Sequence, residues 1–319
     1  MSLASFWRRN RVLVVVFSGL VAVALIQGVL TSRKNIEKNR LYQFSIADVQ
    51  AVGIVNDKIQ MTFVRDGQGW SVTGNPEFKL SKSDMDSFLD DLRHVQIVKN
   101  ISGADLSKYG LDRTNSAIEL AIDGKKDLLV SGAATPSGKG FYVSTRQPGK
   151  SILVLKTACR ELFQKDLYYF RDKKVLDFSV SRTTGVRLTW RGLTVSLRKG
   201  EGTDTWTASF PTVHAVPPEQ VNNLLFELDD LTVREFVEGI SLNLAYYGFP
   251  SGISLGLQSK DGTSQSLEFA GQAGEGGIVM KNADKSTLLR VDYYFLTSLS
   301  NYINIFTNRT SKGEGHDPE

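Results

Sequence analysis

The sequence predicts an α+β fold, in which one N-terminal transmembrane helix precedes a tandem duplication of a module that combines an antiparallel sheet with helices. Three observations support it: an uncharged apolar run near the N-terminus, apolar residues that alternate as in strands, and motifs that recur at a nearly constant offset. The chain has 319 residues, 41% of them hydrophobic, enough for two units that each bury a core. We expect a cytoplasmic tip and anchor at 1–30, a stalk at 31–44, repeats at 45–173 and 174–308, and a disordered tail at 309–319.

The first element is a membrane anchor at residues 12–30, with the sequence VLVVVFSGLVAVALIQGVL and no charged side chain. A helix rises about 1.5 Å per residue, so this run would span roughly 28 Å, close to the hydrocarbon thickness of a bilayer. The alternative is a cleaved signal peptide, whose apolar region would be about 7–15 residues long and end at a small-x-small site. We expect the lipid bilayer to contact the apolar side chains of the run: Val12, Leu13, Val14, Val15, Val16, Phe17, Leu20, Val21, Val23, Leu25, Ile26, Val29 and Leu30.

The basic residues around the anchor leave its orientation nearly balanced by the positive-inside rule. They are Arg8, Arg9 and Arg11 before the run, and Arg33, Lys34, Lys38 and Arg40 after it. We expect the N-terminus in the cytoplasm, because large C-terminal domains cross the membrane largely regardless of their charge. The polar residues 31–44 contain few breakers and predict a helical stalk that leaves the membrane.

The repeats are expected to begin with strands, continue with a helix, return to strands and end in a helix. Alternating apolar residues predict strands before the first helix of each repeat, at 52–54, 59–63, 186–190 and 193–197. Further strands are predicted after it, at 118–122, 128–130, 141–143, 152–155, 253–257, 266–269, 278–280 and 288–291. Apolar residues at i, i+3, i+4 and i+7 predict amphipathic helices at 83–92 and 219–228. Aromatic helices are expected to close the repeats at 159–170 and 293–306.

Aromatic and glycine residues mark the repeats most clearly. Trp70 recurs as Trp206 at an offset of 136, and Tyr109-Gly110 recurs as Tyr247-Gly248 at an offset of 138. These residues could line an aromatic ligand pocket in each repeat, but a strand Trp that packs against a Tyr is more typical of a core. The core interpretation predicts that Trp70→Ala costs about 3–5 kcal/mol of stability. We expect the whole signature to be structural: Trp70, Tyr109, Gly110, Leu111, Asp112, Trp206, Tyr247 and Gly248.

The composition excludes several classes of function. Outside residues 1–30 the basic and acidic residues nearly balance, 35 against 34, so we expect no nucleic-acid binding. A single Cys excludes an internal disulfide, a Cys-based zinc site and an iron–sulfur cluster. Three His leave little for a metal site, and we expect neither a metal nor a cofactor.

Motifs that suggest chemistry are explained better by local structure. The stretch GAATPSGK at 132–139 lacks the spacing and the hydroxyl of a phosphate-binding loop, so we expect a hairpin loop. Asp84, Asp86, Asp90 and Asp91 are expected on a solvated helix face, because two carboxylates on one face are too few for calcium. No Ser or Cys motif near His94 supplies a nucleophile for a base, so we expect no catalytic residues.

The order of these motifs resembles DUF4340, a bacterial domain family of unknown function. The residues that carry the resemblance are Trp70-Ser71, the helix around Leu89, Lys108-Tyr109-Gly110-Leu111-Asp112-Arg113, Ile118-Glu119-Leu120 and Phe141-Tyr142-Val143. The resemblance covers about residues 45–175. The second half departs from it at Phe249-Pro250, where Leu-Asp would stand, and is interpreted as a diverged copy.

The resemblance implies a location and a role. Proteins with this domain are often single-pass, and the family is similar to the C-terminal part of gliding-motility-type ABC transport auxiliary proteins. We therefore expect a non-enzymatic accessory or scaffold protein of the bacterial inner membrane, with the bulk of the chain in the periplasm and an ABC permease and ATPase as partners. The alternative is an envelope ligand-binding module with a lipid or glycan pocket between the repeats, since clefts between domains are favoured sites.

Overall fold

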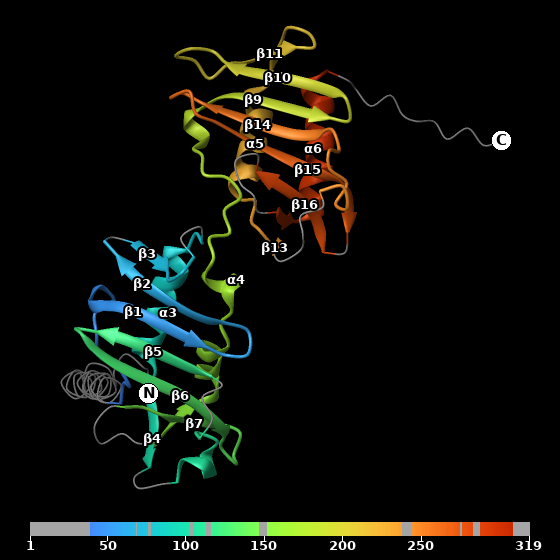
Figure 1. Cartoon of the computed structure of the whole chain (residues 1–319). Helices are drawn as coiled ribbons and strands as arrows, with labels where there is room; N and C mark the ends of the chain where they lie inside the picture. Colours follow the sequence, from blue (N-terminus) through green and yellow to red (C-terminus); the bar gives the residue numbers. More distant parts are fainter. Residues whose placement is uncertain are drawn as a thin grey trace, which may run out of the picture. The chain divides into compact units, whose positions relative to one another are not determined.

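The computed structural model describes residues 39–67, 69–75, 78–101, 105–112, 116–146, 152–237, 244–274, 276–282 and 288–308. The chain divides between Asp172 and Lys173 into two compact units (Figure 1). The predicted anchor at 12–30, the residues 31–38 of the predicted stalk and the tail at 309–319 lie outside the described residues. In the part of the chain that is described, no helix is both long and apolar enough to span a membrane.

The first unit is an antiparallel sheet with helices on one face. Its strands lie in the order β3-β2-β1-β5-β6-β7-β8-β4. The elements are η1 (Ile46–Asp48), β1 (Val49–Val55), β2 (Gln60–Asp66), β3 (Gly69–Val72), α3 (Lys82–His94), β4 (Ile97–Ile101), η2 (Leu106–Tyr109), β5 (Ala117–Ile122), β6 (Lys125–Ala134), β7 (Gly140–Ser144), β8 (Ile152–Lys156), η3 (Thr157–Gln164) and α4 (Leu167–Phe170).

The second unit is also an antiparallel sheet, in the order β12-β11-β10-β9-β14-β15-β16-β17-β13. Its elements are η4 (Val180–Arg182), β9 (Thr183–Trp190), β10 (Leu193–Lys199), β11 (Trp206–Phe210), β12 (His214–Val216), α5 (Pro218–Asp229), β13 (Glu235–Val237), β14 (Ile253–Ser259), β15 (Ser264–Gly274), β16 (Gly277–Asn282), β17 (Leu288–Val291) and α6 (Tyr293–Phe306). Two mainly antiparallel sheets with a few helices confirm the predicted α+β class.

The two strand orders correspond position by position. The run β3-β2-β1-β5-β6-β7-β8-β4 matches β11-β10-β9-β14-β15-β16-β17-β13, and the second sheet adds β12 beyond β11. In each unit the short strand after the first helix, β4 or β13, crosses to the far edge and pairs with the last strand. These two crossing strands were not predicted from the sequence.

The predicted amphipathic helices are confirmed as α3 and α5, which lie behind their sheets in Figure 1. The side chain of Ser81 caps α3 by accepting a hydrogen bond from the Asp84 backbone N–H. The apolar face of each helix is completely or almost completely buried against its sheet, and consists of Met85, Phe88, Leu89 and Leu92 in α3 and of Val221, Leu224, Leu225 and Leu228 in α5. In the first unit the Phe170 ring joins this layer to the sheet, with ring centroids 5.2 Å from Phe88 and 4.8 Å from Phe63.

The helix predicted at 159–170 is wrong as one element, whereas the helix predicted at 293–306 is α6. The structure has the 3-10 helix η3 and then the short helix α4, with a break at Lys165 and Asp166. The Asn56 side-chain amide donates to the carbonyls of Phe163 and Lys165 at 3.0 and 2.8 Å. In a continuous helix these two carbonyls would instead accept hydrogen bonds from backbone N–H groups four residues later. The Asp166 carboxylate then accepts from the Tyr169 N–H at 2.9 Å and starts a new helix.

The predicted stalk is also wrong at its C-terminal end. Residues 39–44 are not helical, and Leu41 and Tyr42 are only 3% and 5% exposed in the core of the first unit. The segment binds the strand region before β4, because Leu41 N donates to Val95 O at 2.8 Å and Ile97 N donates to Asn39 O at 2.7 Å. The first unit therefore begins at least as early as residue 39.

The Tyr42 hydroxyl holds this segment to the sheet. It donates to the Asp127 carboxylate at 2.8 Å, and the Thr145 hydroxyl and Arg146 N–H donate to the same group. Burial, and then the Asp127 charge and hydrogen bond, raise the pKa of the Tyr42 phenol well above 10.0.

This raised pKa predicts an alkaline loss of stability. A phenol whose pKa is higher in the folded state stabilises fully below pH 10, and this contribution is lost as the pH rises above 10. We expect Tyr42→Phe to lower the free energy of unfolding of the first unit at pH 8, and to reduce its further decline between pH 9 and 11. Urea denaturation at each pH measures both effects, with Tyr168→Phe at an exposed position as the control. An unchanged alkaline decline in Tyr42→Phe would contradict the prediction.

Candidate functional site

The first Tyr-Gly motif forms a tight turn on the face of the sheet opposite α3. Gly110 ends η2 in the left-handed region at φ 67°, with hydrogen bonds from its N–H to Ser107 O and from Leu111 N–H to Leu106 O. The Tyr109 ring packs edge-on against Tyr142, with centroids 4.6 Å apart. Tyr142 alternates along β7 with two residues of the main core, so it belongs to the other face of the sheet.

The second Tyr-Gly motif folds in the same way. Gly248 has φ 80°, its N–H donates to Ala245 O at 3.0 Å, and the Phe249 N–H donates to Leu244 O at 3.0 Å. Phe249 is 6% exposed and takes the place of Leu111, which is 4% exposed. The Phe-Pro of the second motif therefore places an apolar buried side chain where the first motif has Leu111, whereas Asp112 is exposed in the first unit.

A glycine in β6 makes room for the first turn. A Cβ on Gly132 would lie 2.5 Å from Tyr109 O and within 2.9 Å of the Leu111 side chain. We expect Gly132→Ala to push the turn off the sheet and to lower the free energy of unfolding by about 1–3 kcal/mol. Urea denaturation measures the loss. Gly256→Ala is the control, because its nearest neighbour would lie at 3.9 Å. Equal effects of the two substitutions would contradict the argument.

The two signature tryptophans occupy equivalent strands in different surroundings. Trp206 in β11 is 2% exposed, because β10 pairs on one side and the extra strand β12 on the other. Trp70 is half-buried in the edge strand β3, under the Arg65 guanidinium at 4.5 Å from its ring centroid. The Trp70 indole N–H has no hydrogen-bond partner in the described part of the chain.

Several polar candidates from the sequence take part in local contacts on α3. On α3, Asp86 pairs with Lys82 and Asp90 with Arg93, both at 2.5 Å. No group of three His, Cys, Asp or Glu among the described residues is arranged to hold a metal. Burial raises the pKa of the Cys159 thiol, which disfavours a nucleophilic thiolate. Of the stretch at 132–139, residues 132–134 are the end of β6, and residues 135–139 form the predicted hairpin loop before β7.

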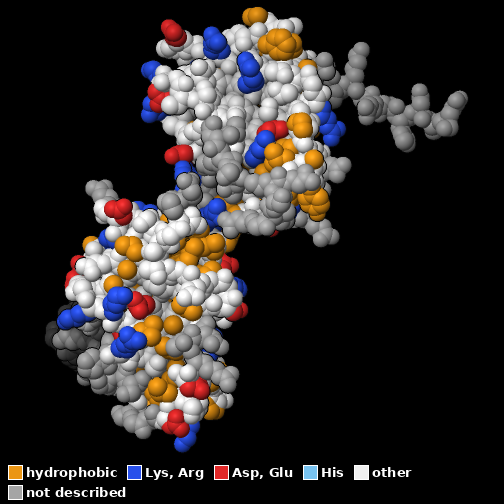
Figure 2. Space-filling view, viewed as in Figure 1, with side chains coloured by type: hydrophobic (Ala, Val, Ile, Leu, Met, Phe, Trp, Pro, Cys, Tyr) orange, Lys and Arg blue, Asp and Glu red, His pale blue; other side chains and the backbone are white. Residues whose placement is uncertain are grey.

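The most distinctive surface is the open face of the second sheet, on the side away from α5 and α6. Residues that are paired across neighbouring strands form rows that run across this face of the sheet. One row is Phe210, Ser196, Arg187, Gly256 and Ser266, and the next is Thr207, Arg198, Gly185, Gln258 and Ser264. Charged carboxylates are absent from these two rows. In Figure 2 this part of the second unit is largely white, the colour of the backbone and of side chains that are neither hydrophobic nor charged.

A hollow of about 910 Å³ lies in this open face. The hollow is deepest at Gly185 in β9 and Gly256 in the neighbouring strand β14, because these two residues have no side chain. Most of the residues that line it are polar: Arg187, Thr194, Ser196, Arg198, Ser209, Gln258, Ser264, Gln265 and Ser266. Phe210 also lines the hollow and is 54% exposed.

The two arginines of the hollow differ from the other described arginines of the second unit. Arg187 and Arg198 have neither an ion pair nor a hydrogen bond with any described residue. The others are partnered: Arg182 with Asp261, Arg234 with Asp292, Arg290 with Glu235, and Arg191 with the Trp190 ring. This pair could not be recognised in the sequence, because a single exposed Arg is common on protein surfaces. Only the register of β9 and β10 places Arg187 near Arg198.

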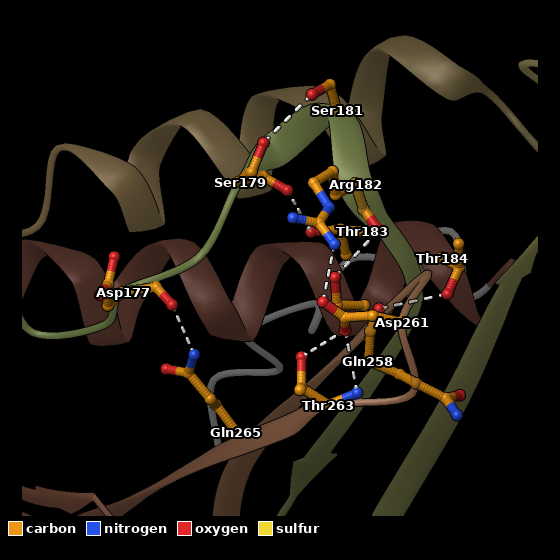
Figure 3. Close-up of polar contacts among 11 residues, drawn as sticks. Asp177, Ser179, Ser181, Arg182, Thr183, Thr184, Gln258, Asp261, Thr263 and Gln265 are labelled. Carbon is orange, nitrogen blue, oxygen red and sulfur yellow. Dashed lines mark hydrogen bonds and ion pairs between the residues drawn. The ribbon is translucent and has the colours of Figure 1, made fainter.

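A second polar cluster lies at the end of the β14–β15 hairpin, where Arg182, Asp261 and Thr263 point toward one another (Figure 3). Arg182 donates to the Asp261 carboxylate at 2.7 Å, and the Thr263 hydroxyl and N–H donate at 2.7 and 3.1 Å. The Thr263 hydrogen bonds, and then the Arg182 charge, lower the pKa of Asp261. Gln265 donates to the Asp177 carbonyl in the same cluster. Because these groups satisfy one another, the cluster is explained as a link between the hairpin and the segment before β9.

Comparison with known proteins gives one match. The model of a family described as a domain of unknown function, DUF4340, matches residues 70–250. The matched span begins at Trp70 and includes both Tyr-Gly turns, so it reaches into both units. No curated protein and no solved structure matches the chain.

Proposed function

The chain belongs to the DUF4340 family, and from this premise we propose that it is a non-enzymatic accessory or scaffold protein, anchored in the inner membrane by residues 12–30 and facing the periplasm. We infer that its two units arose by tandem duplication. The observation that carries the proposal is the correspondence of the two sheets, strand by strand, with the helices of each unit on one face. A duplicated unit of this kind offers two related surfaces to a partner.

The proposed partners are the permease and ATPase of an ABC-type transport system. The support for this choice is the resemblance of the family to ABC transport auxiliary proteins. Chain geometry adds a constraint: only residues 31–38 separate the proposed anchor from Asn39, which binds the first unit. Eight extended residues reach at most about 29 Å, at 3.3–3.6 Å each. A partner of the first unit should therefore lie close to the membrane.

The test is a crosslinked pull-down of the full-length protein in mild detergent, with mass spectrometry of the bound proteins. Recovery of a permease and its ATPase would support the proposal. If this recovery is lost when residues 1–38 are replaced by a cleavable signal peptide, the contact lies at the anchor; if it persists, the contact lies on the two units. Repeated pull-downs without a transporter component would reject the ABC association.

Orientation needs its own experiment, because the flanking charges are balanced. Alkaline phosphatase fused after residue 308 is expected to be active, since it folds only after export. A green fluorescent protein fused at the same place is expected to be dark. The reverse pattern would place the bulk of the chain in the cytoplasm and reject the periplasmic proposal.

A second candidate function is an envelope ligand-binding module. The hollow of about 910 Å³ in the open face of the second sheet favours it, because this volume is at the upper end of the range for small-molecule sites. The polar residues that line the hollow, two arginines among them, favour a glycan over a lipid tail.

A further inference from the structure

We propose that the hollow in the open face of the second sheet binds an acidic oligosaccharide, with Arg187 and Arg198 as the ligands of its carboxylates. This inference deepens the second candidate function and does not depend on the scaffold role. The pull-down and the binding experiment below can therefore fail separately.

The positive charge of the hollow favours an anionic ligand. Arg187 lies opposite Ser196 in the ladder of β9 and β10, and Arg198 lies opposite Gly185, so the two arginines are diagonal neighbours. Diagonal neighbours across two strands are about 7–8 Å apart. The two positive charges therefore lie in the same part of the sheet face, and neither forms an ion pair with a described carboxylate. Each guanidinium can donate two parallel hydrogen bonds to a carboxylate of a bound ligand.

The width of the hollow and its neutral polar side chains indicate which kind of anion it binds. Its lining extends from β11 across β10, β9 and β14 to β15, a width of roughly 19 Å at the usual strand spacing. A single phosphate would occupy a small part of this width. The hydroxyls of Thr194, Ser196 and Ser266 and the amide of Gln258 offer neutral hydrogen bonds over the remainder. An oligosaccharide carries several hydroxyl groups on each sugar ring, enough to form hydrogen bonds with these side chains.

A peptide fits the hollow less well than a saccharide. Strands β9, β10 and β14 are paired on both sides, so their backbone groups are engaged in the ladder and cannot pair with an added strand. Recognition on this face must come from side chains alone. The exposed Phe210 at the rim offers an apolar ring, against which the C–H face of a sugar can pack.

The pairing of Ser196 with Arg187 suggests a substitution that should block anion binding in the hollow. Ser196 faces Arg187 directly, so Ser196→Asp would supply the missing carboxylate from the protein itself. This variant keeps both arginines, and it tests the site even if Arg187→Ala/Arg198→Ala weakens the fold. Arg234→Ala is the matched control, because Arg234 already pairs with Asp292 and lies outside the hollow.

The experiment is calorimetric titration of the full-length protein in detergent with pentagalacturonate, and with maltopentaose as the neutral probe of equal length. We expect binding of pentagalacturonate that weakens with added salt, and at least tenfold weaker binding of maltopentaose. Arg187→Ala/Arg198→Ala and Ser196→Asp should each weaken pentagalacturonate binding at least tenfold, and Arg234→Ala less than twofold. Hydrogen exchange with bound pentagalacturonate should show added protection in β9 and β10.

Three results would overturn the proposal. The first is no binding of pentagalacturonate at millimolar concentration. The second is binding that both hollow variants leave unchanged. The third is a polyaspartate peptide of equal charge that binds at least as tightly through the same arginines, which would replace the saccharide by an acidic peptide.

Discussion

A fragment that begins at residue 45 is expected to have a first unit about 3–6 kcal/mol less stable than a fragment that begins at residue 39. The difference comes from Leu41 and Tyr42, which are almost completely buried. Full burial of one such side chain is worth about 1.5–3 kcal/mol. Whole domains are commonly stable by only about 5–15 kcal/mol. A boundary chosen by the polar appearance of residues 31–44 would therefore remove a large share of the stability of this unit.

The comparison is made between fragments 39–308 and 45–308 by urea denaturation. Hydrogen exchange with mass spectrometry measures the protection of β5–β7, and so reports the stability of the first unit separately from that of the second. Leu41→Ala in the longer fragment should reproduce part of the loss, about 2–5 kcal/mol. Val98→Ala is the control, because Val98 is 58% exposed in the edge strand β4 and should change stability by less than about 0.5 kcal/mol. Equal stability of the two fragments would show that residues 39–44 contact the first unit without stabilising it.

The features that could be predicted from the sequence are those determined by neighbouring residues. The helical spacing of Met85, Phe88, Leu89 and Leu92 depends on one short segment, and that segment is α3. The turn at Gly110 depends on a glycine that adopts a left-handed conformation easily. For the same reason the strands that alternate apolar residues were found, with ends shifted by a few residues.

The features that could not be predicted depend on contacts between distant residues. Asn56 interrupts the helix expected at 159–170 through hydrogen bonds across 107 and 109 positions. The strands β4 and β13 pair with a strand that follows them much later in the chain. The hollow depends on the pairing of β9 with β14, which brings Arg187 beside Gly256. Local patterns contain no information on these pairings.

Trp206→Ala is expected to be the most damaging single substitution of a signature residue, at about 3–5 kcal/mol of the stability of the second unit. Its side chain is 2% exposed, and its strand β11 is paired on both sides. The cavity left by the indole therefore does not lie at a free sheet edge, where the structure could relax to fill it. Trp206→Phe should recover part of the loss, because it keeps an aromatic ring in the same place. Hydrogen exchange in β10 and β14 measures the effect without depending on tryptophan fluorescence.

Trp70→Ala is expected to cost less, about 1–2 kcal/mol, although Trp70 stands at the equivalent position of the first unit. This cost is smaller than the 3–5 kcal/mol that a core interpretation predicts for Trp70. Three properties reduce the cost: β3 is an edge strand, the ring is half-buried, and its contact with the Arg65 guanidinium is worth about 0.5–1 kcal/mol near the surface. Removing the ring also removes an indole N–H that has no described partner, so no hydrogen bond to a described residue is lost. If Trp70→Ala proves as costly as Trp206→Ala, the pairing of β11 with the extra strand β12 does not increase the contribution of Trp206 to stability. A smaller cost at Trp70 would support the extra strand as the reason why Trp206 contributes more.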